Sequence, residues 1–146
     1  MAKITLGKRP ATIVRTVKAP LLDGTEGSMQ VHYRYRTRQE WGELIDRRTA
    51  EARERNAARE EADRTARSLQ QLKDEPIPDT PFSVATLQAE TVAATAGYIM
   101  EIVDGWNLDE PFDLEAVTQL CDELPGMAQA IVDDYRAAIT EGRLGN

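Results

Sequence analysis

The chain has 146 residues and a formal net charge of −7, with 41% hydrophobic residues, 29% charged residues and one cysteine. This length is enough to bury a sizeable core, and a single cysteine excludes an internal disulfide. No apolar stretch reaches the roughly 18 residues that a membrane span needs, and the first residues lack the apolar core of a signal peptide. We therefore expect a soluble intracellular protein with one compact unit and an appendage.

Charge is unevenly distributed along the chain. Residues 1–36 carry seven Lys/Arg and two Asp/Glu, whereas residues 74–146 carry two Lys/Arg and fifteen Asp/Glu. The acidic half disfavours nucleic acid and anionic membranes as partners, because both require cations on the protein. The acidity either keeps the protein soluble or allows the acidic end of one copy to meet the basic end of another. Head-to-tail contacts of that kind build rings or spirals.

Residues 1–36 predict a basic β-hairpin region. Strand-favouring Ile13, Val14 and Val17 precede turn signals at Asp23-Gly24 and Gly27-Ser28. The following residues alternate, so we expect an inward face of Met29, Val31, Tyr33 and Tyr35 and an outward face of Gln30, His32, Arg34 and Arg36. Because an isolated hairpin is marginal in water, its apolar face should lie on a helix or on another copy.

Residues 37–73 predict one long charged helix. Thr37 and Glu40 have the spacing of a capping box, which places the helix start directly after Thr37. Trp41, Leu44 and Ile45 give the first turns an apolar stripe, but no apolar side chain larger than alanine occurs between Asp46 and Ser68. This pattern indicates either a solvated helix or an alanine-lined surface for a partner helix. Residues 74–82 then form a Pro-rich acidic linker.

Residues 83–146 predict an acidic module of three amphipathic helices. Ser83 and Asp113 are candidate N-caps, and Pro125 and Gly142 suit the first position and the end of the last helix. The first helix should carry an apolar stripe as far as Trp106 and stop at Asp104-Gly105. The whole chain is therefore predicted to be α+β and mainly α, and we expect the hairpin and the helical module to form one structural unit.

An aromatic hinge joins the first two of these helices. Its residues are Gly105, Trp106, Leu108, Pro111 and Phe112. We expect them to plug the core between the two helices, so that removing the Trp106 ring would cost roughly 3 to 5 kcal/mol.

No residue set for catalysis, cofactor binding or metal binding is recognisable. His32 is the only histidine and has no sequence-local nucleophile or carboxylate, and Cys121 falls on an apolar helix stripe where a buried thiol is typical. The paired acids at 109–110, 122–123 and 133–134 are expected to form a solvated face, because neighbours on a helix point about 100° apart. We therefore predict a protein that is not an enzyme.

Three stretches carry a family resemblance. They are residues 33–41 (Tyr-Arg-Tyr-Arg-Thr-Arg-Gln-Glu-Trp), residues 105–112 (Gly-Trp-Asn-Leu-Asp-Glu-Pro-Phe) and residues 124–146, which begin Leu-Pro-Gly-Met and end Glu-Gly-Arg-Leu-Gly-Asn. Together they resemble the tail assembly chaperones of long-tailed, siphovirus-type bacteriophages. The resemblance implies a protein that binds the tape measure protein, keeps it soluble and helps recruit tail tube subunits. It also implies action in the host cytoplasm and absence from the mature virion.

Within this interpretation, a candidate surface for self-association or partner binding consists of Tyr33, Arg34, Tyr35, Arg36 and Trp41, and we expect a homo-oligomer. Two other functions remain open. An acidic DNA mimic would inhibit a host nucleic-acid enzyme through carboxylates spaced along one surface. A minor structural protein of the head-tail junction would remain in purified virions.

Overall fold

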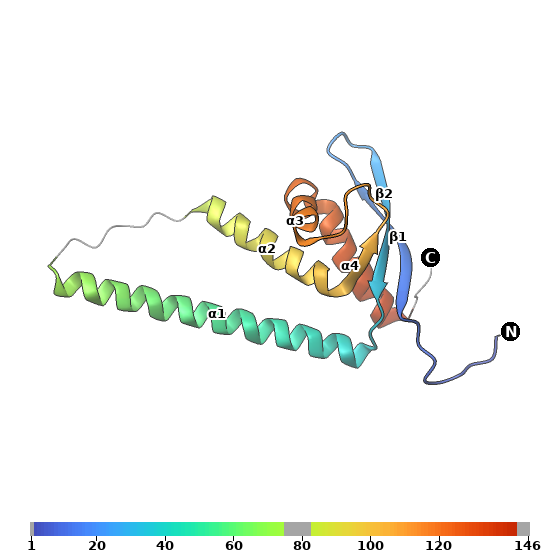
Figure 1. The fold of residues 1–146 in the computed structure, drawn as a ribbon, viewed down its shortest axis with the longest axis horizontal. Helices are drawn as coiled ribbons and strands as arrows, with labels where there is room; N and C mark the ends of the chain where they lie inside the picture. Colours follow the sequence, from blue (N-terminus) through green and yellow to red (C-terminus); the bar gives the residue numbers. More distant parts are fainter. Residues whose placement is uncertain (1, 75–82, 143–146) are drawn as a thin grey trace. The chain divides into compact units, whose positions relative to one another are not determined.

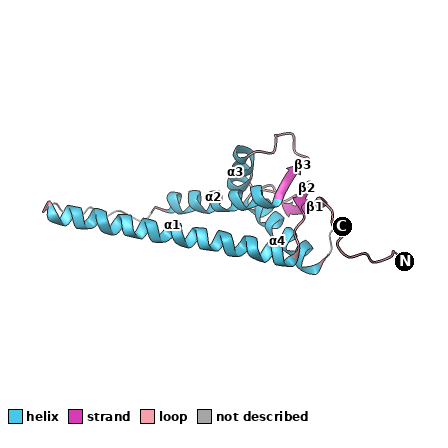
Figure 2. Cartoon of the chain, turned by 60° about the horizontal axis from the view of Figure 1, so that its bottom comes forward, coloured by secondary structure: helices cyan, strands magenta, loops and turns pink. Residues whose placement is uncertain are grey.

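The computed structural model describes residues 2–74 and 83–142. Its elements, in chain order, are β1 (Thr12–Pro20), β2 (Glu26–Arg34), α1 (Arg38–Leu72), α2 (Val84–Ile102), β3 (Val103–Trp106), α3 (Leu114–Glu123) and α4 (Pro125–Glu141). The predicted α+β, mainly helical class is confirmed (Figure 2). Most of the predicted linker, residues 75–82, lies outside the described residues.

The chain divides into two units. One contains the described residues of Met1–Arg38 and Val84–Asn146, and the other contains those of Gln39–Ser83, which are mainly α1. We call the first the core unit. Its antiparallel sheet has the strand order β1-β2-β3, and α2, α3 and α4 all lie on one side of that sheet (Figure 1).

The sheet follows the predicted alternation. Met29, Val31 and Tyr33 of β2 are at most 3% exposed, and they stand opposite Val17, Arg15 and Ile13 of β1. Helix α4 packs on β1 and contributes the buried residues Met127, Ala128, Ile131, Tyr135, Ala138 and Ile139. The apolar face of the hairpin is therefore covered by a helix of the same chain, which is one of the two arrangements expected from the sequence.

The hairpin reverses at only one of the two predicted turn signals. Gly24 has a φ of 85°, and the backbone N–H of Gly24 donates to the carbonyl of Leu21 at 3.0 Å. Asp23 stabilises the turn by accepting from the N–H of Thr25 at 3.0 Å. Gly27 and Ser28, in contrast, are paired with Ala19 and Lys18 inside the sheet. The turn needs only one glycine with positive φ, and Asp23-Gly24 supplies it.

Strand β3 is the main departure from the prediction. The sequence predicts that the first helix of the C-terminal module stops at Asp104-Gly105, with an apolar stripe as far as Trp106. Helix α2 ends slightly earlier, at Ile102, and Val103–Trp106 pairs with β2 as a strand. Val103 stands opposite Tyr33 and Trp106 opposite Val31, with a β-bulge between them. Because of the bulge, Val103 and Trp106 lie on the same face of the sheet although they are three positions apart. A spacing of three positions also fits one face of a helix, so the sequence pattern is compatible with both structures.

The ends of α3 and α4 are as predicted. Asp113 caps α3 by accepting from the N–H of Ala116 at 2.8 Å. Pro125 occupies the first turn of α4, and Gly142 ends it with a left-handed φ of 71°. Together with α2 they bury Ala96, Ile99, Ile102, Val117, Leu120 and Cys121.

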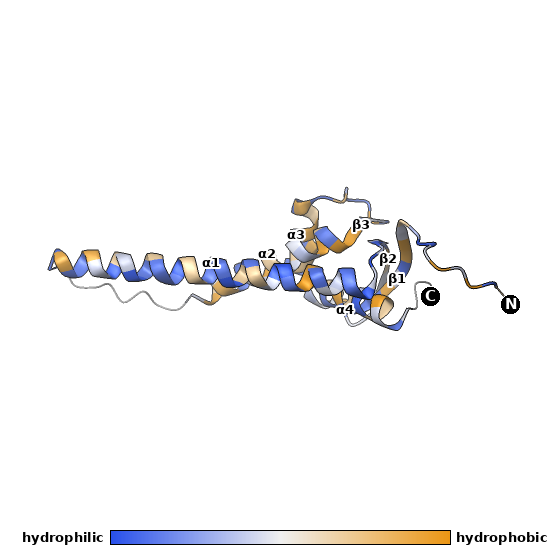
Figure 3. Cartoon of the chain, turned by 90° about the horizontal axis from the view of Figure 1, so that it is seen from below, coloured by the Kyte–Doolittle hydropathy of each residue, from blue (hydrophilic) through white to orange (hydrophobic). Residues whose placement is uncertain are grey.

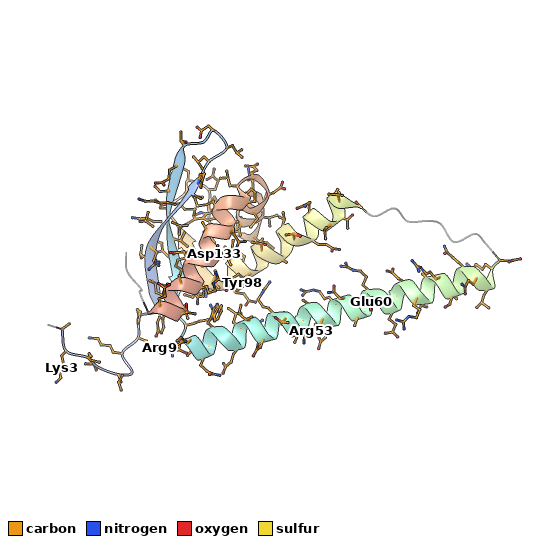
Figure 4. All side chains as sticks on the ribbon, turned by 180° about the vertical axis from the view of Figure 1, so that it is seen from behind. Lys3, Arg9, Arg53, Glu60, Tyr98 and Asp133 are labelled. Atoms are coloured by element: carbon orange, nitrogen blue, oxygen red, sulfur yellow. The ribbon has the colours of Figure 1, made fainter. Side chains whose placement is uncertain are left out.

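Helix α1 is continuous over 35 residues and begins directly after Thr37, as the capping box predicts. Every residue from Arg53 to Leu69 is exposed, and side chains such as Arg53 and Glu60 project from it (Figure 4). The hydropathy colouring is predominantly hydrophilic along this helix (Figure 3). Exposed charge pairs such as Arg47 and Glu51, at 3.4 Å, add small increments to its stability.

Candidate functional site

The proposed contact residue Tyr33 is buried in the core unit. Its side chain is 0% exposed, its hydroxyl donates to the carbonyl of Ile131 on α4 at 3.1 Å, and its ring lies 5.2 Å from the ring of Tyr135. Burial raises the pKa of Tyr33 well above its ordinary value. The assignment of Tyr33 to a partner surface is therefore wrong, because its side chain joins the sheet to α4.

Arg36 also departs from the expected outward position. Its Nη1 donates to the carbonyl of Glu101 at 3.0 Å and to the hydroxyl of Tyr135 at 3.3 Å. The same tyrosine hydroxyl donates to the carbonyl of Arg34 at 2.9 Å. Arg36 comes after the end of β2, so the strand alternation no longer determines its direction. Its guanidinium instead links the end of the hairpin to α2 and α4.

The remaining residues of the predicted surface are not gathered into one patch of the core unit. Arg34 is exposed and pairs with Asp104 of β3 at 3.5 Å. Tyr35 is half-buried, with the guanidinium of Arg9 5.1 Å from its ring centre. Trp41 belongs to α1, which is in the other unit. The structure thus brings Tyr33 and Arg36 into the core unit's interior contacts and leaves Arg34 on its surface.

The sequence interpretation missed a largely buried ion pair between the sheet and a helix. Arg15 lies on the inward face of β1, and its Nε and Nη2 donate to the two carboxylate oxygens of Asp134 on α4 at 2.9 and 2.8 Å. The two side chains are only 12% and 20% exposed. Asp134 is therefore not part of the expected solvated face, whereas its neighbour Asp133 is exposed. The residues are 119 positions apart, so no local signal indicates this pair.

The aromatic hinge is half-exposed rather than a core plug. Gly105 and Trp106 lie in β3, and Leu108, Pro111 and Phe112 lie in the following loop. Trp106 donates through Nε1 to the carbonyl of Glu110 at 2.8 Å and meets Phe112 edge to face, with ring centres 5.1 Å apart. Asn107 continues the strand pairing, because its side-chain oxygen accepts from the N–H of Gln30 at 2.8 Å. The hinge is thus the end of β3 and the following loop, and this loop folds back so that Glu110 and Phe112 contact Trp106.

Between the hinge and α3 lies a small open groove. It has a volume of about 130 Å³, and its lining includes Trp106, Leu108, Leu120 and Leu124 together with Glu110 and Glu123. We call this the hinge groove. Leu120 is 7% exposed and forms part of its buried wall, whereas the two glutamates are exposed. The groove is therefore apolar with an acidic border.

The first half of α2 is an exposed apolar helix. Residues 84–94 contain one charged residue, Glu90, and within this segment Val84 is 60% exposed and Leu87 46% exposed. Burial begins only at Ala96. The core unit thus buries only the second half of the apolar stripe that the sequence predicts for this helix. Exposed apolar surface of this kind often marks a protein-binding site.

The free cysteine of the described residues is buried. Cys121 is 5% exposed, and burial raises the pKa of its thiol to about 11, so the thiolate nucleophile is suppressed at neutral pH. No group of three or more His, Cys, Asp or Glu positioned to hold a metal occurs in residues 2–74 and 83–142. None of the described helices is long and apolar enough to cross a membrane.

The core unit is thus a three-stranded antiparallel sheet packed against helices, with an apolar groove and an exposed apolar helix segment at its surface. A family model described as phage tail assembly chaperone matches residues 1–146. The chain belongs to this family of phage tail assembly chaperones. Searches of curated proteins and of solved structures gave no match.

Proposed function

We propose that this chain binds the tape measure protein of its phage, keeps it soluble and helps recruit tail tube subunits while the tail is built. It acts in the host cytoplasm as a homo-oligomer, has no catalytic role and is absent from the mature virion. Membership of the tail assembly chaperone family supports the general role. The observation that supports a client-binding role most directly is the exposed apolar first half of α2.

Residues 84–94 of α2 have the chemistry that an amphipathic client helix requires. Helix-in-groove recognition places apolar side chains at helical spacing against an apolar partner face. Val84 and Leu87 are three positions apart and exposed, and several alanines and Val92 surround them. With Glu90 as the one charged residue of this segment, an apolar client meets little desolvation cost there.

The charge of the remaining chain suits a chaperone that must keep an apolar client in solution. Helix α1 presents exposed charged residues along most of its length. The formal charge of −7 produces repulsion between loaded complexes. These features favour solubility of the complex without adding affinity for the client.

The alternative of a DNA mimic is less well supported, because several acids have structural partners. Asp134 is held by Arg15, Asp104 is paired with Arg34, and Asp113 caps α3. These carboxylates serve the fold and do not form a free series of phosphate-like charges.

The test is a binding measurement with purified protein and the tape measure protein, or fragments of it, in solution. Replacing both exposed residues, Val84→Gln/Leu87→Gln, should weaken binding at least tenfold. The matched control is Val14→Gln/Leu22→Gln, which removes an exposed valine and leucine from the hairpin, where they are 49% and 87% exposed. Equal affinities of the two variants and the parent would refute α2 as the client site.

A further inference from the structure

The N-terminal residues of the core unit form an exposed apolar and basic segment. Residues 2–9, which we call the arm, precede β1. Ile4 is 89% exposed and Leu6 is 92% exposed, and Lys3, Lys8 and Arg9 flank them in sequence. Two bulky apolar side chains so fully exposed on one short segment favour a partner site that would cover them.

The hinge groove has complementary chemistry. The groove is lined by apolar side chains that include Trp106, Leu108 and Leu120. Its lining also includes the exposed carboxylates of Glu110 and Glu123. Its volume of about 130 Å³ is close to that of cavities of about 150 Å³ that take up one small apolar molecule. One isoleucine or leucine side chain of the arm matches such a space, and the flanking lysines match the two carboxylates.

The arm is directed away from the groove of its own copy. Arg9 lies 5.1 Å from the ring centre of Tyr35, and the N–H of Tyr35 donates to the carbonyl of Ala11 at 3.2 Å. These contacts hold the base of the arm beside β1. The groove lies beyond β3, at the opposite edge of the sheet. The arm, which carries Lys3 and Arg9 in Figure 4, extends away from α3 and the hinge in Figures 1 and 2.

We propose that the arm of one copy binds the hinge groove of a second copy, with Ile4 or Leu6 in the groove and Lys3 and Lys8 beside Glu110 and Glu123. Charge complementarity favours a second copy as the occupant, since the basic arm and the acidic groove are both present on every chain. The contact joins two different surfaces, so it repeats from copy to copy and yields a ring or a spiral. This inference rests on the proposed homo-oligomer and deepens it.

The test uses two charge-reversed variants of the full chain. Variant A is Lys3→Glu/Lys8→Glu, and variant B is Glu110→Lys/Glu123→Lys. In either variant alone the arm and the groove carry the same sign, so analytical ultracentrifugation should show loss of the species larger than a monomer that the parent forms. In an equimolar mixture, each arm faces a groove of opposite sign in the other variant. The larger species should therefore return.

A second pair of variants tests the apolar contact without changing charge. Leu6→Asn should reduce self-association at least tenfold, whereas Leu22→Asn, at a leucine that is 87% exposed in the hairpin turn, should leave it unchanged. The far-UV circular dichroism spectrum of each variant should match that of the parent, because all the substituted side chains are exposed.

Three results would overturn the proposal. They are a parent that is monomeric at all concentrations and salts, variants A and B that assemble like the parent, and an A and B mixture that stays monomeric. Because the measurement uses no tape measure protein, it separates this contact from client binding. A parent chain that self-associates but does not bind the tape measure protein would count against the proposed client binding and not against this contact.

Discussion

Arg15 and Asp134 form a bidentate ion pair that links β1 to α4, with N···O distances of 2.9 and 2.8 Å, although the two residues are 119 positions apart in the sequence. Removing one partner should leave a partly buried charge unpaired. We therefore expect Asp134→Ala to lower the free energy of unfolding by about 2 kcal/mol. Urea unfolding followed by circular dichroism measures the change.

The neighbouring acid provides a matched control for this prediction. Asp133 pairs with Arg136 at 3.6 Å, but both side chains are more than half exposed. Asp133→Ala should thus change the unfolding free energy by less than about 1 kcal/mol. Equal losses of unfolding free energy at the two positions would show that the Arg15–Asp134 pair stabilises the fold no more than an exposed ion pair does.

Trp106 provides a second stability test. Its ring is half-exposed, so we expect Trp106→Ala to cost about 2 kcal/mol rather than the 3 to 5 kcal/mol of a fully buried aromatic residue. Trp106→Phe keeps an aromatic ring and removes the hydrogen bond to Glu110, which should cost about 1 kcal/mol. Denaturant unfolding of both variants separates the two contributions. Complete unfolding of Trp106→Ala would restore the interpretation of the hinge as a core plug.

Cys121 should make the core unit sensitive to alkaline pH. Burial raises the pKa of its thiol to about 11, whereas a thiol in an unfolded chain titrates near pH 8.5, as a rough reference. The unfolded state therefore loses the proton first, and stability falls as pH rises through this window. Tyr33, whose pKa is also raised by burial, adds to the fall at higher pH. Unfolding of Cys121→Ala should show a shallower decline between about pH 9 and pH 11, and parallel curves for parent and variant would contradict this.

Helix α1 should respond to substitution independently of the core unit. Ala62 lies in its fully exposed section, and Ala62→Gly should destabilise the helix locally by about 1 kcal/mol. Hydrogen exchange should become faster around residue 62, while the protection of β2 and α4 stays unchanged. Faster exchange throughout the core unit would show that the two units unfold together.

Local patterns in the sequence predicted much of this fold. Alternation identified the inward face of β2, and short-range chemistry identified the Asp113 cap, Pro125 at the start of α4 and Gly142 at its end. These features depend on neighbours within a few residues. They can therefore be recognised without knowledge of the tertiary structure.

The errors have a common physical origin in long-range pairing. Val103 and Trp106 fit both a helical stripe and a bulged strand, and only the position of β2 decides between them. The partner of Arg15 lies on a distant helix, so sequence spacing could not reveal it. The surface assignment of Tyr33 conflicted with its inward position in the alternation, and the structure supports the alternation.

The soluble amount of tape measure protein upon co-expression is the most direct measure of the proposed function. With the parent chain, most of the tape measure protein should appear in the soluble fraction and co-purify with it. Val84→Gln/Leu87→Gln should leave it in the pellet, whereas Val14→Gln/Leu22→Gln should behave like the parent. A tape measure protein that stays insoluble with the parent chain, or is equally soluble without it, would contradict the proposed role.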